Sequence, residues 1–137
     1  MKRLFILILI PLLLAGCQAK TTAVAVPENF QEISQPMAEN IFTSLENDDY
    51  ESFHKDFAEK MLAATSADTF QTLRESILQS LGNYQSMEYD QTNYEEGYFI
   101  SYFNLQFSDG MVTVYLVLNT EEPYLVEGFW FPDFPSE

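Results

Sequence analysis

Apart from its carboxylates, this 137-residue chain has few side chains of the types that catalyse reactions or bind metals. It contains one histidine, His54, and one cysteine, Cys17, against 21 aspartates and glutamates. A zinc site normally uses several Cys or His ligands, so a histidine-based metal site is excluded by count. No segment has the loop pattern of an EF-hand, and no glycine-rich phosphate loop is present. We therefore expect no metal site and no cofactor, and we place His54 at the edge of an apolar helix stripe.

Glu127 is the carboxylate with the most suggestive surroundings, because it stands between Val126 and Phe129 in an otherwise apolar segment. A four-residue loop over 120–123 would place Glu127 opposite Leu116, on a buried sheet face. Buried carboxyl groups without partners have raised pKa values, as many general bases do. A register shift of one residue would instead return Glu127 to the outer face. We assign no catalytic residue and name Glu127 only as a candidate, with Glu127 and Trp130 as candidate ligand-binding residues.

Cys17 lies at the end of an N-terminal secretion signal. Lys2 and Arg3 precede an apolar run from Leu4 to Leu14, which is long enough for a signal peptide but shorter than the roughly 20 residues of a spanning helix. The following Leu14-Ala15-Gly16-Cys17 resembles the lipobox of bacterial-type lipoproteins, in which the cysteine thiol takes a diacylglycerol. An uncleaved signal anchor with an incidental cysteine is the alternative. We predict a signal peptide over 1–16, a lipidated (palmitate-bearing) Cys17 and a flexible tether over 17–27.

Residues 28–137 are predicted to form a single α+β domain, because about 120 residues remain after cleavage. Pro36 suits the first turn of the first helix, and Phe30 and Ile33 lie upstream of it, in an irregular lead-in or an extra turn. Periodic apolar residues predict three helices, over 35–47, from Asp48 or Asp49 onward with a possible break near Ala58, and from Ser66 or Asp68 to a stop at Gly82. Segments rich in aromatic and β-branched residues predict four antiparallel strands, over 84–94, 98–107, 111–119 and 124–131.

The Asp109-Gly110 pair predicts the register of the central hairpin, because Asp-Gly is typical of a type I′ turn. The predicted pairs are Phe107 with Val112, Leu105 with Val114 and Phe103 with Leu116. One sheet face is then densely apolar and is expected to lie under the helices. The other face mixes amides with Tyr98, Tyr102 and Tyr115, and such faces suit interfaces. We expect a partly covered or simply exposed sheet surface there, with a contact to a second copy (a homodimer) or to a protein partner as the alternative.

The charge of the chain excludes nucleic acid as a partner. Loss of Lys2 and Arg3 with the signal changes the formal charge from −15 to −17. A surface of this sign repels polyphosphates and anionic headgroups and attracts cations or basic partners, although salt screens it within about 8 Å. A solvated, soluble surface is the simplest interpretation.

The order of elements resembles the nuclear transport factor two-like superfamily, whose cystatin-like sheet wraps around a long helix as a cone. The resemblance covers roughly 35–134 and is carried by the Leu45–Phe53 helix junction, the Leu81-Gly82 helix stop and the closing Val126–Phe129 strand. More narrowly, the chain is similar to a small secreted domain of unknown function in that superfamily. The resemblance implies three helices on a curved four-stranded sheet, with a cone that in some members holds a small apolar ligand or an isomerase, dehydratase or cyclase site.

These observations predict a membrane-anchored extracytoplasmic lipoprotein of the cell envelope. Its function is expected to be the non-enzymatic binding of a protein partner or a small apolar ligand. The alternatives are a small isomerase- or dehydratase-like enzyme acting on an apolar substrate in the cone, and a structural role in the envelope. The enzyme would need an open cavity lined by Glu127, a tyrosine and Trp130.

Overall fold

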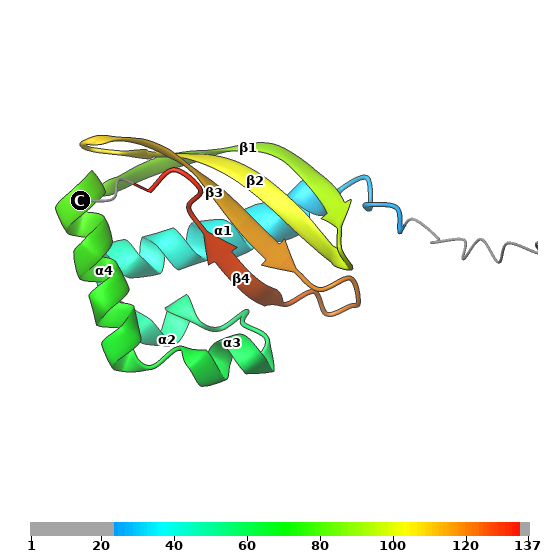
Figure 1. The fold of residues 1–137 in the computed structure, drawn as a ribbon, viewed down its shortest axis with the longest axis horizontal. Helices are drawn as coiled ribbons and strands as arrows, with labels where there is room; N and C mark the ends of the chain where they lie inside the picture. Colours follow the sequence, from blue (N-terminus) through cyan, green and yellow to red (C-terminus); the bar gives the residue numbers. More distant parts are fainter. Residues whose placement is uncertain (1–23, 135–137) are drawn as a thin grey trace, which may run out of the picture.

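The structure is a computed structural model and describes residues 24–134 of the chain. Within these residues, four helices precede four strands. The predicted signal segment and Cys17 lie outside the described residues. No helix within 24–134 is long and apolar enough to cross a bilayer. The elements, labelled in Figure 1, are α1 (Phe30–Asn47), α2 (Tyr50–Phe53), α3 (Glu59–Ala64), α4 (Ala67–Leu81), β1 (Tyr84–Glu95), β2 (Tyr98–Phe107), β3 (Gly110–Leu118) and β4 (Val126–Trp130).

The first helix begins at Phe30, so the residues upstream of Gln35 extend the helix and do not form an irregular lead-in. The Phe30 side chain is 1% exposed, and its ring lies edge-on to Phe99 with centroids 4.7 Å apart. Pro36 therefore lies inside the helix rather than in its first turn, which corrects the prediction. Proline cannot donate the backbone hydrogen bond to Glu32. Burial of the Phe30 ring offsets that cost, since losing a buried phenylalanine side chain costs about 3–5 kcal/mol.

The predicted second helix is two short helices, α2 and α3, so the described residues contain four helices rather than three. Asp49 caps α2 as predicted, because its carboxylate accepts a hydrogen bond from the Ser52 N–H. The break near Ala58 is confirmed and has a tertiary cause. The Ala58 N–H donates to the Val126 carbonyl, and the Val126 N–H donates to Asp56, each at 2.8 Å. The segment between the helices therefore pairs with the start of β4 instead of continuing as helix.

The last helix, α4, has the ends that the sequence predicted. The Ser66 hydroxyl accepts from the Thr69 N–H at its start, and Gly82 ends the helix with φ +76°. Phe70, Ile77 and Leu81 are buried on one side. Leu73, on the same apolar stripe, is only half-buried, so part of this stripe is left uncovered by the sheet.

The sheet is an antiparallel meander in the order β1-β2-β3-β4. The register predicted for the central hairpin is wrong by two residues. The observed pairs are Phe107 with Gly110, Leu105 with Val112 and Phe103 with Val114. The Ser108 and Asp109 N–H groups donate to the carbonyls of Asn83 and Leu81, which ties this loop to the end of α4. A shift of two leaves each side chain on its predicted face, because side chains alternate with a period of two.

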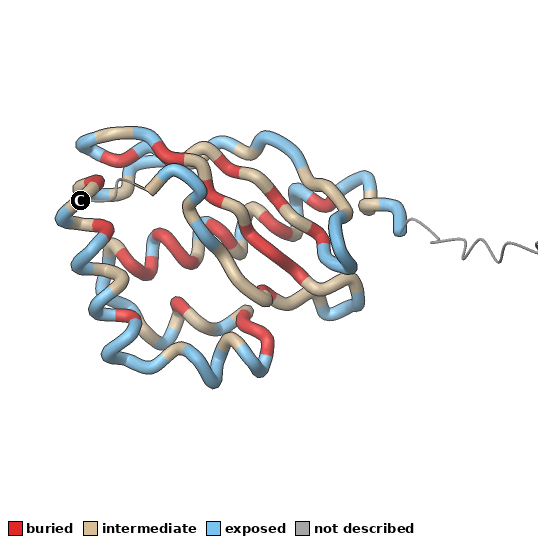
Figure 2. The backbone as a smooth tube through the Cα atoms, in the orientation of Figure 1, coloured by how far each residue is buried: buried red, intermediate tan, exposed pale blue. Residues whose placement is uncertain are grey.

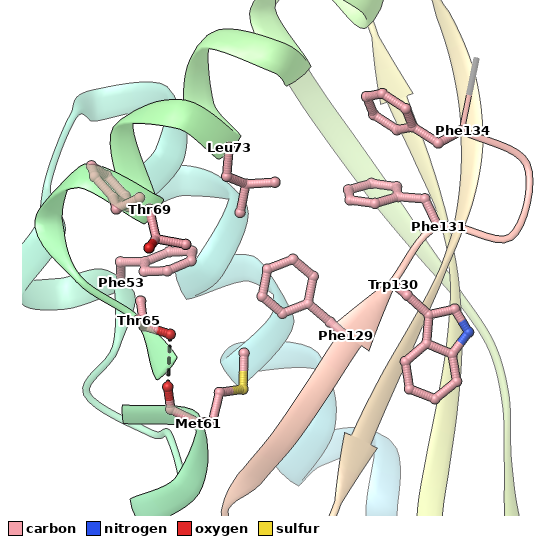
Figure 3. Close-up of a pocket in the computed structure, with 10 residues that line it drawn as sticks. Phe53, Met61, Thr65, Thr69, Leu73, Phe129, Trp130, Phe131 and Phe134 are labelled. Atoms are coloured by element: carbon pink, nitrogen blue, oxygen red, sulfur yellow. Dashed lines mark hydrogen bonds between the residues drawn. The ribbon is translucent and has the colours of Figure 1, made fainter. Parts of the chain in front are cut away.

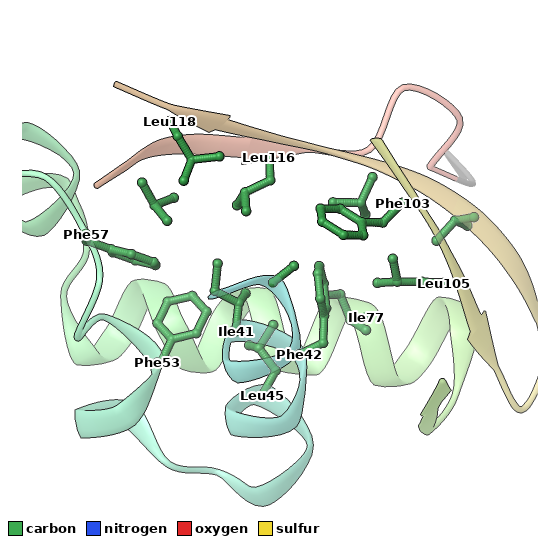
Figure 4. Close-up of a cluster of buried hydrophobic side chains, with 14 of the residues drawn as sticks. Ile41, Phe42, Leu45, Phe53, Phe57, Ile77, Phe103, Leu105, Leu116 and Leu118 are labelled. Carbon is green, nitrogen blue, oxygen red and sulfur yellow. The ribbon is translucent and has the colours of Figure 1, made fainter. Parts of the chain in front are cut away.

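The inward sheet face and α1 form the core, as predicted. Figure 2 shows buried residues along β2 and β3, the two central strands of the sheet. Figure 4 shows Phe103 and Leu116 of the sheet facing Ile41 and Phe42 of α1. Side chains at most 1% exposed occur on both layers and include Ile41, Phe42, Phe99, Phe103, Leu105, Val114, Leu116 and Leu118. The outer sheet face, by contrast, is half-buried or exposed at most positions.

Candidate binding sites on the two sheet faces

Glu127 does not lie opposite Leu116, and its predicted place on the buried face is wrong. Leu116 pairs with Phe129, Val117 with Gly128, and Leu118 with Val126. The single step from Val117 to Leu118 on β3 is therefore matched by two steps on β4, from Gly128 to Val126. The extra residue between them, Glu127, forms a β-bulge. The bulge turns Val126 and Phe129 inward together, although they are three residues apart, and leaves Glu127 on the other side. Gly128 is the signal in the sequence that could have indicated this bulge, because an isolated glycine inside a strand weakens it and often marks a bulge.

Glu127 instead joins an open groove of about 590 Å³ on the outer sheet face, which we call the outer groove. Tyr98 and Trp130 are the large aromatic residues of this groove, and they are 41% and 46% exposed. The grouping of Glu127, a tyrosine and Trp130 thus exists, but outside the core rather than within it. The groove is lined by Lys60, Glu95, Glu96, Tyr98, Ile100, Val117, Glu127, Gly128 and Trp130.

An aromatic row crosses the sheet beside the outer groove. The ring centroids of Tyr102 and Tyr115 are 4.6 Å apart, and those of Tyr115 and Trp130 are 5.9 Å apart, both in edge-on geometry. The Tyr102 hydroxyl donates to Glu95 Oε1 at 2.9 Å. Burial of the ring, together with this carboxylate, raises the pKa of Tyr102 above its ordinary value. Tyr102 and Tyr115 of the mixed sheet face therefore lie side by side, as the expected alternation of the strands implies.

A second cavity, of about 360 Å³, opens on the helix side of β4, and we call it the inner pocket. Figure 3 shows Met61, Thr65, Thr69 and Leu73 on one side and the aromatic residues of β4 and the C-terminal segment on the other. Its lining residues are Phe53, Met61, Thr65, Thr69, Phe70, Leu73, Phe129, Trp130, Phe131 and Phe134. Of these lining residues, only Trp130 was a candidate from the sequence, because the walls of the pocket come from segments far apart in the chain.

The inner pocket has the chemistry of an apolar binding site. None of its ten lining residues is ionisable. Its two hydroxyls are already engaged, since Thr65 Oγ1 donates to the Met61 carbonyl at 2.7 Å and Thr69 Oγ1 is 3.0 Å from Ser66 Oγ. The Trp130 indole points away from Phe129 and toward the outer face (Figure 3), so it belongs to the outer groove. The pocket can exclude water from an apolar molecule but has no group to exchange protons with it.

The other polar residues of interest hold the helices in place. His54 is half-buried, with Nδ1 2.6 Å from the Tyr50 carbonyl oxygen and its ring packed on Tyr50. Glu46 accepts from the Asn83 side-chain amide at 2.6 Å and from the Tyr84 N–H at 3.0 Å, which joins α1 to the start of β1. Within residues 24–134, no three His, Cys, Asp or Glu side chains are arranged to hold a metal ion.

Comparison with known families adds two findings. A family model described as a protein of unknown function (DUF3887) matches residues 38–123. A model of the prokaryotic membrane lipoprotein lipid attachment site matches residues 1–18, which include Cys17. No curated protein matches the chain.

Proposed function

Since the chain belongs to the DUF3887 family and is a lipid-anchored membrane lipoprotein, we propose that it binds a small apolar ligand, without catalysis, in the inner pocket. The observation that carries the proposal is the lining of that pocket, which is apolar apart from two threonines. Cys17 is the residue that we propose to be lipidated, because it is the only cysteine and ends the lipobox-like sequence. The ligand would then be met at the membrane surface outside the cytoplasm.

The size and openness of the inner pocket support a small-molecule ligand. A volume of about 360 Å³ lies at the lower end of the range of about 300–1,000 Å³ that small-molecule sites occupy. Phe129, Phe131 and Phe134 are half-buried and contribute rings that a ligand would cover further. Each methylene group buried there would contribute about 0.8 kcal/mol to binding. Because binding would bury apolar surface of both the rings and the ligand, the pocket would favour uncharged, hydrocarbon-rich molecules over polar ones.

The proposal also assigns the chain to the nuclear transport factor two-like fold, in which the inner pocket would be the open end of the cone. Four N-terminal helices and a four-stranded meander folded over α1 support that assignment. The enzyme alternative loses its main support, because Glu127 lines the outer groove and not the inner pocket. An acid or base acting on a bound apolar substrate would have to lie in the same cavity as that substrate.

The test uses methyl NMR of the full lipidated chain in dodecyl maltoside micelles, with ¹³C-labelled methionine methyl groups and naphthalene as the probe. Met61 lines the inner pocket, whereas Met111 is 68% exposed and is not among its lining residues, so the second methyl group is an internal control. Naphthalene should shift the Met61 signal saturably and leave the Met111 signal in place. Equal shifts of both signals would reflect uptake into the micelle and would refute the proposal.

Thr69→Phe provides a blocked pocket, because Thr69 is an exposed residue at the mouth of the cavity. Thr72→Phe is its matched control, since Thr72 is exposed on the same helix but does not line the pocket. The added ring at position 69 should weaken naphthalene binding at least fivefold. The same ring at position 72 should change it less than twofold.

A further inference from the structure

The outer groove contains two large aromatic side chains that are exposed to solvent. Tyr98 and Trp130 remain 41% and 46% exposed, although the other aromatic residues of the sheet are buried or half-buried. Trp130 continues the row formed by Tyr102 and Tyr115, so the groove has an extended aromatic side. Exposed aromatic surface gathered in one concave place is typical of a binding surface.

Negative charge lines the same groove without being neutralised. Glu95, Glu96 and Glu127 face a single cation, Lys60. Among the residues that the structure describes, the one ion pair within 4.0 Å joins Arg74 to Asp48, so these three carboxylates form none. Like charges gathered around a concave surface raise the local concentration of cations. The groove is therefore complementary to a positively charged group.

One of these carboxylates is already held in position. Glu95 accepts hydrogen bonds from the Tyr102 hydroxyl at 2.9 Å and from the Asn93 side-chain amide at 3.3 Å. Both bonds end on Oε1, and within residues 24–134 no side chain or backbone group donates to Oε2. A carboxylate fixed through one oxygen loses little freedom when the other oxygen accepts from a ligand.

We propose that the outer groove binds an arginine side chain presented by an extended segment of another protein. A guanidinium group is planar, stacks on aromatic faces such as those of Tyr98 and Trp130, and donates in pairs to carboxylates such as Glu127. This site lies on the opposite face of the sheet from the inner pocket and does not depend on it. A second copy of the chain fits less well, because it would bring further carboxylates against those of the groove.

Trp130 makes the proposal measurable, because it is the only tryptophan of the chain and it lines the groove. The experiment titrates the full lipidated protein in dodecyl maltoside micelles with the peptide acetyl-Gly-Arg-Gly-Arg-Gly-amide and records tryptophan fluorescence at physiological salt. A matched peptide carries citrulline, an uncharged analogue of arginine, at both arginine positions. The arginine peptide should give a saturable change, with a Kd at least tenfold lower than that of the citrulline peptide.

Glu127→Gln should weaken binding of the arginine peptide about fivefold, which corresponds to about 1 kcal/mol. Its matched control is Glu75→Gln, which removes the same charge from an exposed position on α4 that does not line the groove. The control should change the Kd less than twofold. Lys60→Met should strengthen binding, because it removes the only cation that competes for the carboxylates.

Several results would overturn the inference. Equal binding of the citrulline peptide would show that charge is not recognised, and an equal loss in Glu75→Gln would show attraction by the whole acidic surface. Equally tight binding of choline chloride would assign the groove to quaternary ammonium ligands instead. A dimer in sedimentation that Glu127→Gln stabilises would assign the face to a second copy. The naphthalene shift of Met61 should be the same in Glu127→Gln, so failure here and failure of the apolar ligand site are distinguishable.

Discussion

Replacement of Gly82 by alanine tests how the end of α4 and the β2–β3 loop fit together. Gly82 has φ +76° and ψ −151°, a conformation that is essentially restricted to glycine. A Cβ atom added there would overlap with Ser108 Oγ, far inside any normal contact distance. Ser108 Oγ in turn accepts a hydrogen bond from the Asn83 N–H at 3.0 Å. The substitution therefore strains the backbone and also displaces a hydroxyl that is in use.

The expected cost is the sum of these two effects. Backbone strain in this region is of order 1–3 kcal/mol, and a lost hydrogen bond costs about 1 kcal/mol. We expect Gly82→Ala to lower the free energy of unfolding by about 2–4 kcal/mol. A domain of this size has a total stability of about 5–15 kcal/mol, so the loss should be easily measured.

Urea denaturation followed by circular dichroism is the assay, and two other glycines are the controls. Gly97 has φ +92° but space around its Cβ position, so Gly97→Ala should cost only the strain of a positive φ, about 1–2 kcal/mol. Gly110 has neither a positive φ nor a close neighbour, so Gly110→Ala should stay within about 0.5 kcal/mol of the parent chain.

Ser108→Ala separates the two parts of the Gly82 effect. It removes the Oγ atom that the new Cβ would meet, so Gly82→Ala should cost about 1 kcal/mol less in the Ser108→Ala background. The reasoning is refuted if Gly82→Ala costs no more than Gly110→Ala. It is equally refuted if Ser108→Ala leaves the cost of Gly82→Ala unchanged.

Two further predictions concern the anchor and the pH dependence of folding. Cys17→Ala should abolish incorporation of radiolabelled palmitate in growing cells, because it removes the only thiol of the chain, and continued labelling would contradict our assignment of the lipid site. Burial, helped by the charge of Glu39, raises the pKa of Tyr84 from 10.0 to about 12, so the folded chain holds this proton more tightly than the unfolded chain does. The free energy of unfolding should therefore fall as the pH rises from about 10 to about 12, and this fall, measured by urea denaturation, should be smaller in Tyr84→Phe; an unchanged fall in the variant would contradict the assignment to Tyr84.

Local sequence signals predicted much of the fold. The caps at Asp49 and Ser66, the stop at Gly82 and the division of the sheet into an apolar and a mixed face are all confirmed. Each depends on interactions within a few residues or on a period of two along a strand. The predicted hairpin register failed without changing the faces, because the error was an even number of residues.

Long-range contacts account for the features that were missed. The start of α1 depends on Phe99, which lies far along the chain from Phe30, and the break between α2 and α3 depends on pairing of Ala58 with Val126. The inner pocket likewise forms only where α3 and α4 meet β4 and the segment after it. The periodicity of apolar residues in a single sequence contains no information about contacts between such distant segments.

The membrane-anchored location of this protein follows from the sequence by itself. So does the alternation of side chains between the two faces along each regular strand. The signal and its cysteine act as a linear segment, and alternation follows from the geometry of an extended chain. The tertiary structure decided where the candidate site residues lie. A single bulge moved Glu127 from the expected buried face to the outer groove, whereas Phe129, two residues further on, stayed on the inner face and lines the inner pocket. One extra residue in an edge strand reverses the sheet face on which the preceding side chain lies. Only the packing of that strand against its neighbours determines whether such an extra residue is accommodated.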